Sequence, residues 1–371
     1  GRIRRGSRGE RCLRHQCGYR LGKVKDKIHG GIKVFYDKPI FFEKNRVFRV
    51  YTGGKLFADF FGDDSTDGNY PEEWVASSVH ALNEGSTDEH EGISKIEGTG
   101  LYLSEALEQY RSELLGERED IGILTKILDS AIRLPVQAHP DKAFSAKYFN
   151  SKYGKEESWV ILATRPGAKI FYGFKDGVTL EEFEHAIDES DSGSNEMESL
   201  LKSIDVKPGD VVYIPAKLVH AIGSGCLLLE VQEPTDFTIQ PECWCGEYRL
   251  SDNEMYLGLS REDALGCFDM AKSYPAPLTP KALESGDGVL YEAMIDGSIT
   301  TSFSVRMVTL SGGSFTLGRG AAIYVALDGA GRITGDGYSR DIKKGDYFMM
   351  PAAAAGKFTA SGDIKIAECF A

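Results

Sequence analysis

One short pattern occurs twice in the sequence: Lys207-Pro-Gly-Asp210-Val-Val-Tyr-Ile-Pro215 and Lys343-Lys-Gly-Asp346-Tyr-Phe-Met-Met-Pro351. Each copy is a Gly-Asp turn, four residues suited to a β-strand, and a proline. The copies lie 136 residues apart, and both are flanked by short apolar runs and Gly-rich turns. The repeat predicts two related β-barrel modules, one in each half of the chain.

The two copies differ at a position that matters for metal binding. Five residues after Pro215 is His220, whereas five residues after Pro351 is Gly356. Imidazole is a common ligand for zinc and iron, so the first module is the one expected to hold a metal. Its other ligands should come from neighbouring strands. Gln137 and His139 share a face of a predicted strand, and Glu157 opens the next strand.

The remaining segments predict a mainly β protein with helical insertions. Apolar spacing predicts strands at 134–139, 159–164, 168–173, 211–214 and 226–231, and helices at 101–115, 121–132, 179–187 and 197–204. The expected domains are a basic extension (1–31), a metal-binding barrel with helical insertions (32–249), a helical connector (250–288) and a second barrel without metal ligands (289–371).

Charge is distributed unevenly along the 371 residues. The net charge is −13, but residues 1–28 carry ten Lys/Arg against two Asp/Glu. This basic segment has the composition of a disordered extension, a transit peptide or an RNA-binding tail. The acidic body argues against a nucleic-acid binder, and no apolar run is long enough to cross a membrane. Seven cysteines without a framework spacing indicate free thiols in a reducing compartment. A cytoplasmic protein is expected.

Several motifs resemble one enzyme family. Gly209-Asp210, Pro215 and His220 resemble the second motif of the cupins, which are jelly-roll barrels that hold a metal. Leu134-Pro-Val-Gln137-Ala-His139-Pro-Asp-Lys142, Tyr153-Gly-Lys155-Glu-Glu157-Ser-Trp159 and the segment 207–230 resemble type I phosphomannose isomerases. Gly53-Gly54-Lys-Leu-Phe and Pro71-Glu-Glu-Trp74-Val-Ala-Ser77 resemble the family's N-terminal strand and Trp-centred motif. The resemblance covers residues 33–371.

The resemblance implies two cupin jelly-roll barrels with a helical insertion and a metal-dependent aldose–ketose isomerase. The implied reaction interconverts mannose 6-phosphate and fructose 6-phosphate through an enediol, with one Zn²⁺ per chain. The implied metal ligands are Gln137, His139, Glu157 and His220, and the implied catalytic residues are Lys155, Asp236 and Lys142. Metal and lysine suit this chemistry, because a proton moves between C1 and C2 while an oxyanion develops.

The substrate side departs from the family pattern. Gln240 stands where many members have an arginine, and Pro135 stands where many have a serine. Arg133, Gln240 and Trp74 are the candidate substrate contacts. A basic cluster of Arg133, Lys142, Lys147, Lys152 and Lys155 would attract an anionic substrate, although a solvated surface has the same composition.

Three further functions stay open at this point. They are an isomerase for a different phosphosugar, a non-catalytic sugar-phosphate-binding cupin and a cupin oxidoreductase that uses iron and oxygen. The expected partner is a small phosphosugar, with neither nucleic acid nor membrane, and the chain is expected to be a monomer or a homodimer.

Overall fold

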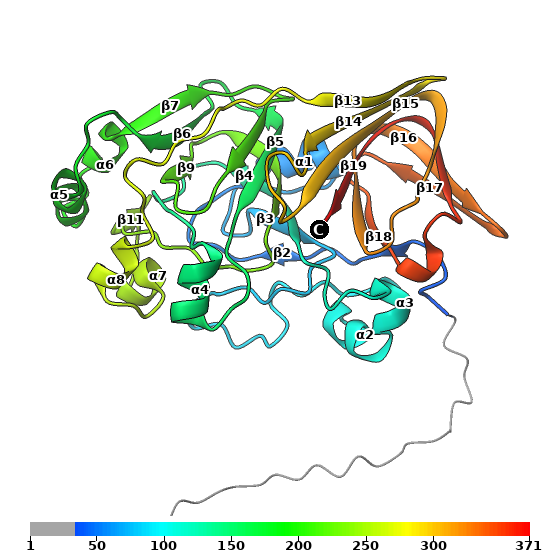
Figure 1. Cartoon of the computed structure of the whole chain (residues 1–371), viewed down its shortest axis with the longest axis horizontal. Helices are drawn as coiled ribbons and strands as arrows, with labels where there is room; N and C mark the ends of the chain where they lie inside the picture. Colours follow the sequence, from blue (N-terminus) through cyan, green and yellow to red (C-terminus); the bar gives the residue numbers. More distant parts are fainter. Residues whose placement is uncertain (1–33) are drawn as a thin grey trace, which may run out of the picture. The chain divides into compact units, whose positions relative to one another are not determined.

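The computed structural model describes residues 34–371, and its strands form two large antiparallel sheets and two smaller ones (Figure 1). The mainly β prediction is confirmed. The predicted basic extension, residues 1–31, lies outside the described residues. Within residues 34–371, no helix is long and apolar enough to span a membrane.

The first barrel is built from a six-stranded and a three-stranded sheet. The larger sheet has the order β2 (Arg46–Val47), β3 (Glu72–Val75), β4 (Leu124–Ser130), β10 (Cys226–Gln232), β5 (Glu157–Thr164) and β8 (Val211–Ile214). The smaller sheet has the order β7 (Leu201–Asp205), β6 (Lys169–Phe174) and β9 (His220–Ile222). Apolar side chains from both sheets, such as Trp159, Ile161 and Phe171, pack into one buried core.

The second barrel is built from one eight-stranded sheet. Its order is β1 (Ile40–Phe41), β18 (Tyr347–Met350), β16 (Ala322–Gly335), β19 (Thr359–Phe370), β15 (Ser304–Thr316), β14 (Val289–Ile295) and β13 (Lys281–Gly286), with β17 (Tyr338–Lys343) paired to β16. Two of these strands fall outside the expected domain 289–371. β1 comes from the N-terminal part of the chain, and β13 comes from the expected helical connector.

Eight short helices accompany the strands within residues 34–371. They are α1 (Lys55–Phe61), α2 (Leu103–Gln109), α3 (Arg111–Leu115), α4 (Lys142–Phe149), α5 (Leu180–Ser190), α6 (Glu196–Ser199), α7 (Asp252–Tyr256) and α8 (Arg261–Leu265), with a 3₁₀ turn, η1 (Ala352–Ala354), and a hairpin of β11 (Trp244–Cys245) and β12 (Tyr248–Arg249). The predicted helices at 101–115 and 179–187 are confirmed as α2, α3 and α5. For α5, a capping box between Thr179 and Glu182 fixes the start.

The repeat has the same geometry in both barrels. The N–H of Gly209 and the C=O of Asp210 bond to the backbone of Ile161, at 2.8 and 2.9 Å. The N–H of Gly345 and the C=O of Asp346 bond in the same way to Ala326, both at 2.8 Å. The predicted duplication is therefore confirmed at the level of strand register.

Strand register also identifies what occupies the metal-ligand positions of the second barrel. Ile214 of β8 pairs with Glu157, and Met350, the matching residue of β18, pairs with Ala322. Ala322 thus stands where the first barrel has Glu157, and Gly356 stands where it has His220. Neither residue carries a side chain that can bind a metal.

Three sequence predictions of secondary structure differ from the structure. Residues 121–132 form β4 and not a helix, because this strand is buried on both faces and its apolar run has no strand alternation to reveal it. In the segment 197–204, the short helix α6 gives way to β7. The predicted strand 134–139 is reduced to bridges at Gln137 and Ala138.

Candidate metal centre and active site

A cavity of about 490 Å³ lies in the first barrel. Its walls come from β3, β4, β5 and β10, from the loop 80–86, from the segment 236–240 and from α7. The ionisable side chains that line it are Arg49, Tyr51, Glu72, His80, Glu84, Lys126, His139, Lys155, Glu157, Glu230, Asp236 and Glu254. Most are buried, so their charges interact in a medium of low polarity.

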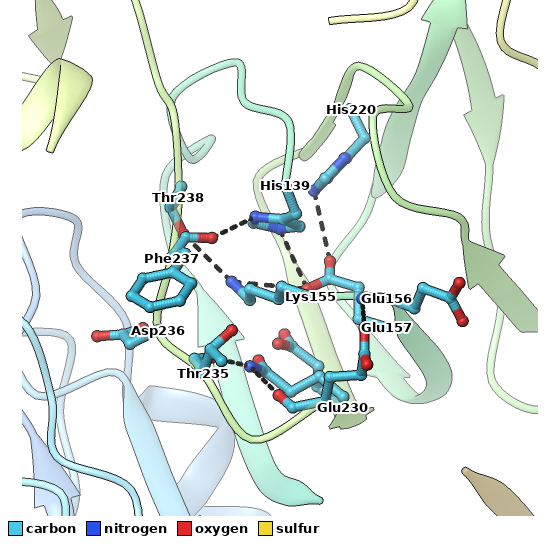
Figure 2. Close-up of polar contacts among 12 residues, drawn as sticks. His139, Lys155, Glu156, Glu157, His220, Glu230, Thr235, Asp236, Phe237 and Thr238 are labelled. Atoms are coloured by element: carbon cyan, nitrogen blue, oxygen red, sulfur yellow. Dashed lines mark hydrogen bonds and ion pairs between the residues drawn. The ribbon is translucent and has the colours of Figure 1, made fainter. Parts of the chain in front are cut away.

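Three predicted metal ligands meet beside the cavity: His139 and Glu157 line it, and buried His220 contacts Glu157. Nε2 of His139 lies 3.2 Å from Oε2 of Glu157, and Nε2 of His220 lies 3.4 Å from Oε1 of the same carboxylate. Figure 2 shows the two rings and the carboxylate pointing toward one another. One ligand atom from each residue lies within 4.8 Å of the others, and all three residues are buried.

The backbone fixes which nitrogen of each imidazole faces the carboxylate. Nδ1 of His139 lies 3.0 Å from the carbonyl oxygen of Phe237, and Nδ1 of His220 lies 2.8 Å from that of Leu218. A carbonyl can only accept, so both Nδ1 atoms carry a proton, and the Nε2 atom of each ring is the one that faces the carboxylate. Burial lowers the pKa of His139 to about 3, which keeps the ring neutral and suited to a metal.

The donor set fits a divalent cation. Within residues 34–371, His220 Nε2 and Glu157 Oε2 are buried and have no hydrogen-bond partner. A buried imidazole nitrogen and a buried carboxylate oxygen without partners are unfavourable, and a cation between them would satisfy both. Two imidazoles and a carboxylate are a common ligand set for zinc and other first-row metals. These residues can therefore bind a metal ion.

Gln137 lies beside this triad. Its backbone exchanges two hydrogen bonds of 2.9 Å with His220, and its side chain lines the cavity. The amide oxygen is a suitable fourth ligand, as the sequence predicted.

Lys155 lies next to the triad and is buried. Its Nζ lies 3.7 Å from Oε2 of Glu157 and donates to Oγ1 of Thr238 at 3.2 Å. Burial lowers the pKa of Lys155, and the charge of Lys126 acts in the same direction. A buried amine with a lowered pKa is suited to proton transfer.

A row of buried charges crosses the floor of the cavity. Lys126 on β4 lies 3.0 Å from Glu230 on β10 and 3.7 Å from Glu72 on β3. Burial and the nearby Glu157 raise the pKa of Glu230 to about 7. Burial alone would raise the pKa of Glu72 as well. Arg49 and Lys126 outweigh burial there, and the pKa of Glu72 lies well below its ordinary value.

Asp236 also lines the cavity and is held by Arg49. Arg49 Nη2 donates to both carboxylate oxygens of Asp236 at 3.1 Å, and the N–H of Leu82 donates to the same group at 2.8 Å. The predicted residue is thus in the cavity, in a fully bonded ion pair.

Three predicted residues are not part of the described cavity wall. Lys142 begins α4 and reaches Glu233 and Ser302, on the side of the second barrel. Arg133 forms an ion pair with Glu242. Trp74 is buried beneath the wall, where its Nε1 donates to Glu72 at 2.6 Å. Gln240 and Pro135, the two departures from the family pattern, do line the cavity.

The charged residues of the cavity that sequence reasoning missed include Arg49, Glu72, Lys126 and Glu230. A usable signal was present for two of them. Lys126 and Glu230 interrupt apolar strand sequences, Leu-Thr-Lys-Ile-Leu in β4 and Leu-Leu-Glu-Val in β10. A charge in a strand buried on both faces is rare unless it is paired, and such pairs often mark functional sites.

Known proteins resemble the chain in sequence along most of its length. Residues 298–371 match the model described as "Mannose-6-phosphate isomerase, cupin domain". Mannose-6-phosphate isomerase ManA of Bacillus subtilis is 32% identical over 345 residues, which are 90% of this chain and 98% of the relative. Mannose-6-phosphate isomerase of Streptococcus mutans is 29% identical over 335 residues, 89% of this chain and 97% of the relative.

Solved structures resemble the chain in fold. The mannose 6-phosphate isomerase of Bacillus subtilis superposes with a TM-score of 0.72 at 25% identity, covering 90% of this chain and 99% of the other. A putative mannosephosphate isomerase of Archaeoglobus fulgidus gives 0.68 at 20% identity, covering 92% and 99%. The similarity extends through both barrels of this chain. The first barrel contains the buried triad of His139, Glu157 and His220. The chain belongs to the type I mannose-6-phosphate isomerase family of the cupin superfamily.

Proposed function

We propose that the protein is a metal-dependent isomerase that interconverts mannose 6-phosphate and fructose 6-phosphate. The observation that carries the proposal is the meeting of the His139–Glu157–His220 triad with buried Lys155 in one cavity, in a chain of this family. An aldose–ketose isomerase needs a group that stabilises the oxygen atoms of an enediol and a base that moves one proton, and this cavity supplies both.

Zinc is the proposed metal, held by Gln137, His139, Glu157 and His220. The support is the donor set of two imidazoles, a carboxylate and an amide oxygen. A solved mannose 6-phosphate isomerase with 15% identity and a TM-score of 0.64 has zinc bound. Such a cation would supply a Lewis acid that polarises the substrate carbonyl and stabilises the negative charge that develops there.

Lys155 is the proposed base. It takes the proton from C2 of the aldose, which leaves the enediol, and returns that proton to C1 to give the ketose. Glu230, whose raised pKa favours a protonated carboxyl, is suited to exchange a hydroxyl proton between O2 and O1. Lys126, which also pairs with Glu72, holds Glu230 in place. The acidic composition and the free buried thiols support a cytoplasmic location as part of this proposal.

The test is a turnover assay with the metal controlled. The protein is stripped with a chelator, dialysed and reloaded with zinc, and fructose 6-phosphate formation from mannose 6-phosphate is followed. We expect activity that chelation removes and zinc restores. His220→Asn should abolish both zinc binding and turnover, whereas His185→Asn, at an exposed histidine on α5, should leave both unchanged. A folded, zinc-loaded protein without turnover would contradict the proposal.

One observation keeps a different phosphosugar as the second candidate. The described Lys and Arg side chains of the cavity, Arg49, Lys126 and Lys155, each lie within 4 Å of a carboxylate, and Gln240 adds no charge. The same assay should therefore include other aldose phosphates. If one of them has a higher kcat/KM than mannose 6-phosphate, the second candidate replaces the first.

A further inference from the structure

Three consecutive residues hold three different parts of the candidate site. The carboxylate of Asp236 accepts the N–H of Leu82, the carbonyl of Phe237 accepts Nδ1–H of His139, and the hydroxyl of Thr238 accepts Nζ of Lys155. Figure 2 shows the carbonyl of Phe237 and the side chain of Thr238 directed at these two residues. The position of the segment 236–238 therefore sets the orientation of a metal ligand and of the proposed base.

Arg49 ties this segment to the barrel. Its Nη2 donates to both oxygens of Asp236 at 3.1 Å, its Nε lies 3.1 Å from Oε1 of Glu72, and its Nη1 donates to Asn83 at 3.0 Å. The guanidinium also lies over the ring of Trp74, 5.2 Å from its centroid. One side chain thus connects β3, the loop 80–86 and the segment 236–238.

We propose that Arg49 is a positioning residue that holds His139 and Lys155 in working orientation through the segment 236–238. Asp236 is the counter-ion of this anchor and does not exchange protons with the substrate. The proposal rests on the proposed function for the roles of His139 and Lys155. In this proposal, Arg49 and Asp236 affect the reaction through the residues that they position, His139 and Lys155.

The hydrogen bonds favour anchoring over substrate binding. Each nitrogen of Arg49 has a protein partner, and both oxygens of Asp236 are bonded, so neither group is available without breaking the anchor. Both side chains are largely buried, at 12% and 9% exposed. A planar guanidinium can join three partners at fixed angles, which an ammonium group cannot do.

The experiment compares Arg49→Gln and Arg49→Lys with a matched control, Arg46→Gln. Arg46 is a partly buried arginine of β2 that pairs with Glu73 and Asp63, outside the cavity wall. Zinc affinity is measured by competition with a chromogenic chelator in the absence of substrate. The values of kcat and KM are then measured at saturating zinc, and folding is checked by tryptophan fluorescence.

We expect Arg49→Gln to weaken zinc binding about 10- to 100-fold, the usual effect of losing a partner behind a metal ligand. It should also lower kcat at saturating zinc with little change in KM. Arg49→Lys keeps the positive charge, but an ammonium group cannot join three partners at fixed angles. This variant should therefore lose most of the orienting effect of Arg49. Arg46→Gln should cost stability without changing zinc affinity.

Two results would overturn the proposal. An unchanged zinc affinity with a raised KM would mean that Arg49 binds substrate. An equal loss of zinc affinity in Arg46→Gln would mean that any lost ion pair has this effect.

If Arg49→Gln does not fold, Asp236→Asn replaces it, because it removes the charge and keeps the shape. For this variant, a lost kcat at unchanged zinc affinity would make Asp236 a catalytic residue. Zinc affinity is measured without turnover, so failure of the proposed function would be seen separately, in the wild-type assay.

Discussion

Several charged side chains of the cavity are buried, and each is stabilised by a buried partner of opposite charge. Glu72 accepts hydrogen bonds from Tyr51 and Trp74 at 2.5 and 2.6 Å and pairs with Arg49 and Lys126. Removing one member of such a network leaves the others buried without compensation, which costs far more than a surface ion pair does. Glu72 is therefore important for stability as well as for the site.

Replacing Glu72 with Gln should destabilise the protein by about 3–5 kcal/mol at pH 7. The folded pKa of Glu72 lies below its ordinary value of 4.5, so its stabilising contribution is present above pH 4.5 and is lost as the pH falls through the folded pKa. The gap between wild type and variant in urea unfolding should therefore narrow below pH 4.5. Glu284→Gln, at an exposed residue of β13, is the control. A gap that widens toward acid would contradict the assignment.

Replacing Lys155 with Met should lower kcat by about 10²- to 10⁴-fold, the usual contribution of a general base. Zinc should bind at least as tightly as in wild type, because a positive charge 3.7 Å from Glu157 is removed. The control is Lys152→Met, whose side chain is exposed and pairs with Glu119. Turnover within a few-fold of wild type would exclude Lys155 as the base. Steady-state kinetics at saturating zinc distinguishes the two results.

How far residues can be predicted from sequence depends on whether their partners are local. His139, Glu157 and His220 could be predicted, because each lies in a short motif. Lys142 lies in the same motif as His139, yet it points toward Glu233, since the first turn of α4 directs it away from the cavity. Arg49 and Glu72 gain their roles from partners far away in the sequence, and no local pattern encodes such pairing.

At the scale of elements, the repeated turn offers a matched pair of substitutions. Gly209 and Gly345 have φ angles of +94° and +90°, which side chains other than glycine rarely adopt. A Cβ at Gly209 would meet no atom within 4 Å, whereas a Cβ at Gly345 would lie 2.9 Å from the backbone oxygen of Phe60. Gly209→Ala should cost about 1–3 kcal/mol of backbone strain. Gly345→Ala should cost more, because the backbone of α1 must also move.

Urea unfolding of the two variants, with wild type alongside, checks this difference. Equal costs would show that the contact with α1 does not constrain the second turn. In either case, the loss of stability in Gly209→Ala measures backbone strain alone, because a Cβ at Gly209 would meet no atom within 4 Å.

Elements with clear signals could be predicted, and those without could not. The capping box of α5 and the Gly-Asp turns before β8 and β18 are local signals, and the structure has the elements where they were expected. β4 carries an apolar run with helical spacing, and only its position between β3 and β10 makes it a strand. The segment 134–139 stays mostly irregular, because it bridges to His220 and Ile239 at single residues.

At the scale of the whole molecule, residues 34–371 contain one core inside each barrel and one shared core between them. The shared core joins outward side chains of the first sheet, such as Val160 and Leu229, to outward side chains of the second, such as Ile323 and Val325. The prediction of two β-barrel modules agrees with the way the strands group into sheets. It does not reveal this shared core, since the residues of one strand alternate between two cores.

The shared core predicts that the two barrels unfold together. The three tryptophans, Trp74, Trp159 and Trp244, lie on β3, β5 and β11, outside the sheet of the second barrel, so their fluorescence reports on the first barrel. Ile333→Ala, in the second barrel's own core, removes a fully buried side chain and should cost about 2–5 kcal/mol. If unfolding is cooperative, this distant change lowers the urea midpoint seen by tryptophan fluorescence as much as that seen by far-UV circular dichroism.

The control is Leu283→Ala, at an exposed position of β13, which should move neither midpoint. An Ile333→Ala protein whose fluorescence midpoint stays at the wild-type value while its circular dichroism splits into two steps would mean that the barrels are independent. The second barrel would then be dispensable for the metal centre. With coincident midpoints, the second barrel stabilises the outer face of β4, β5 and β10, the strands that carry Lys126, Glu157 and Glu230. A barrel without metal ligands would then contribute to the chemistry through the packing of that sheet.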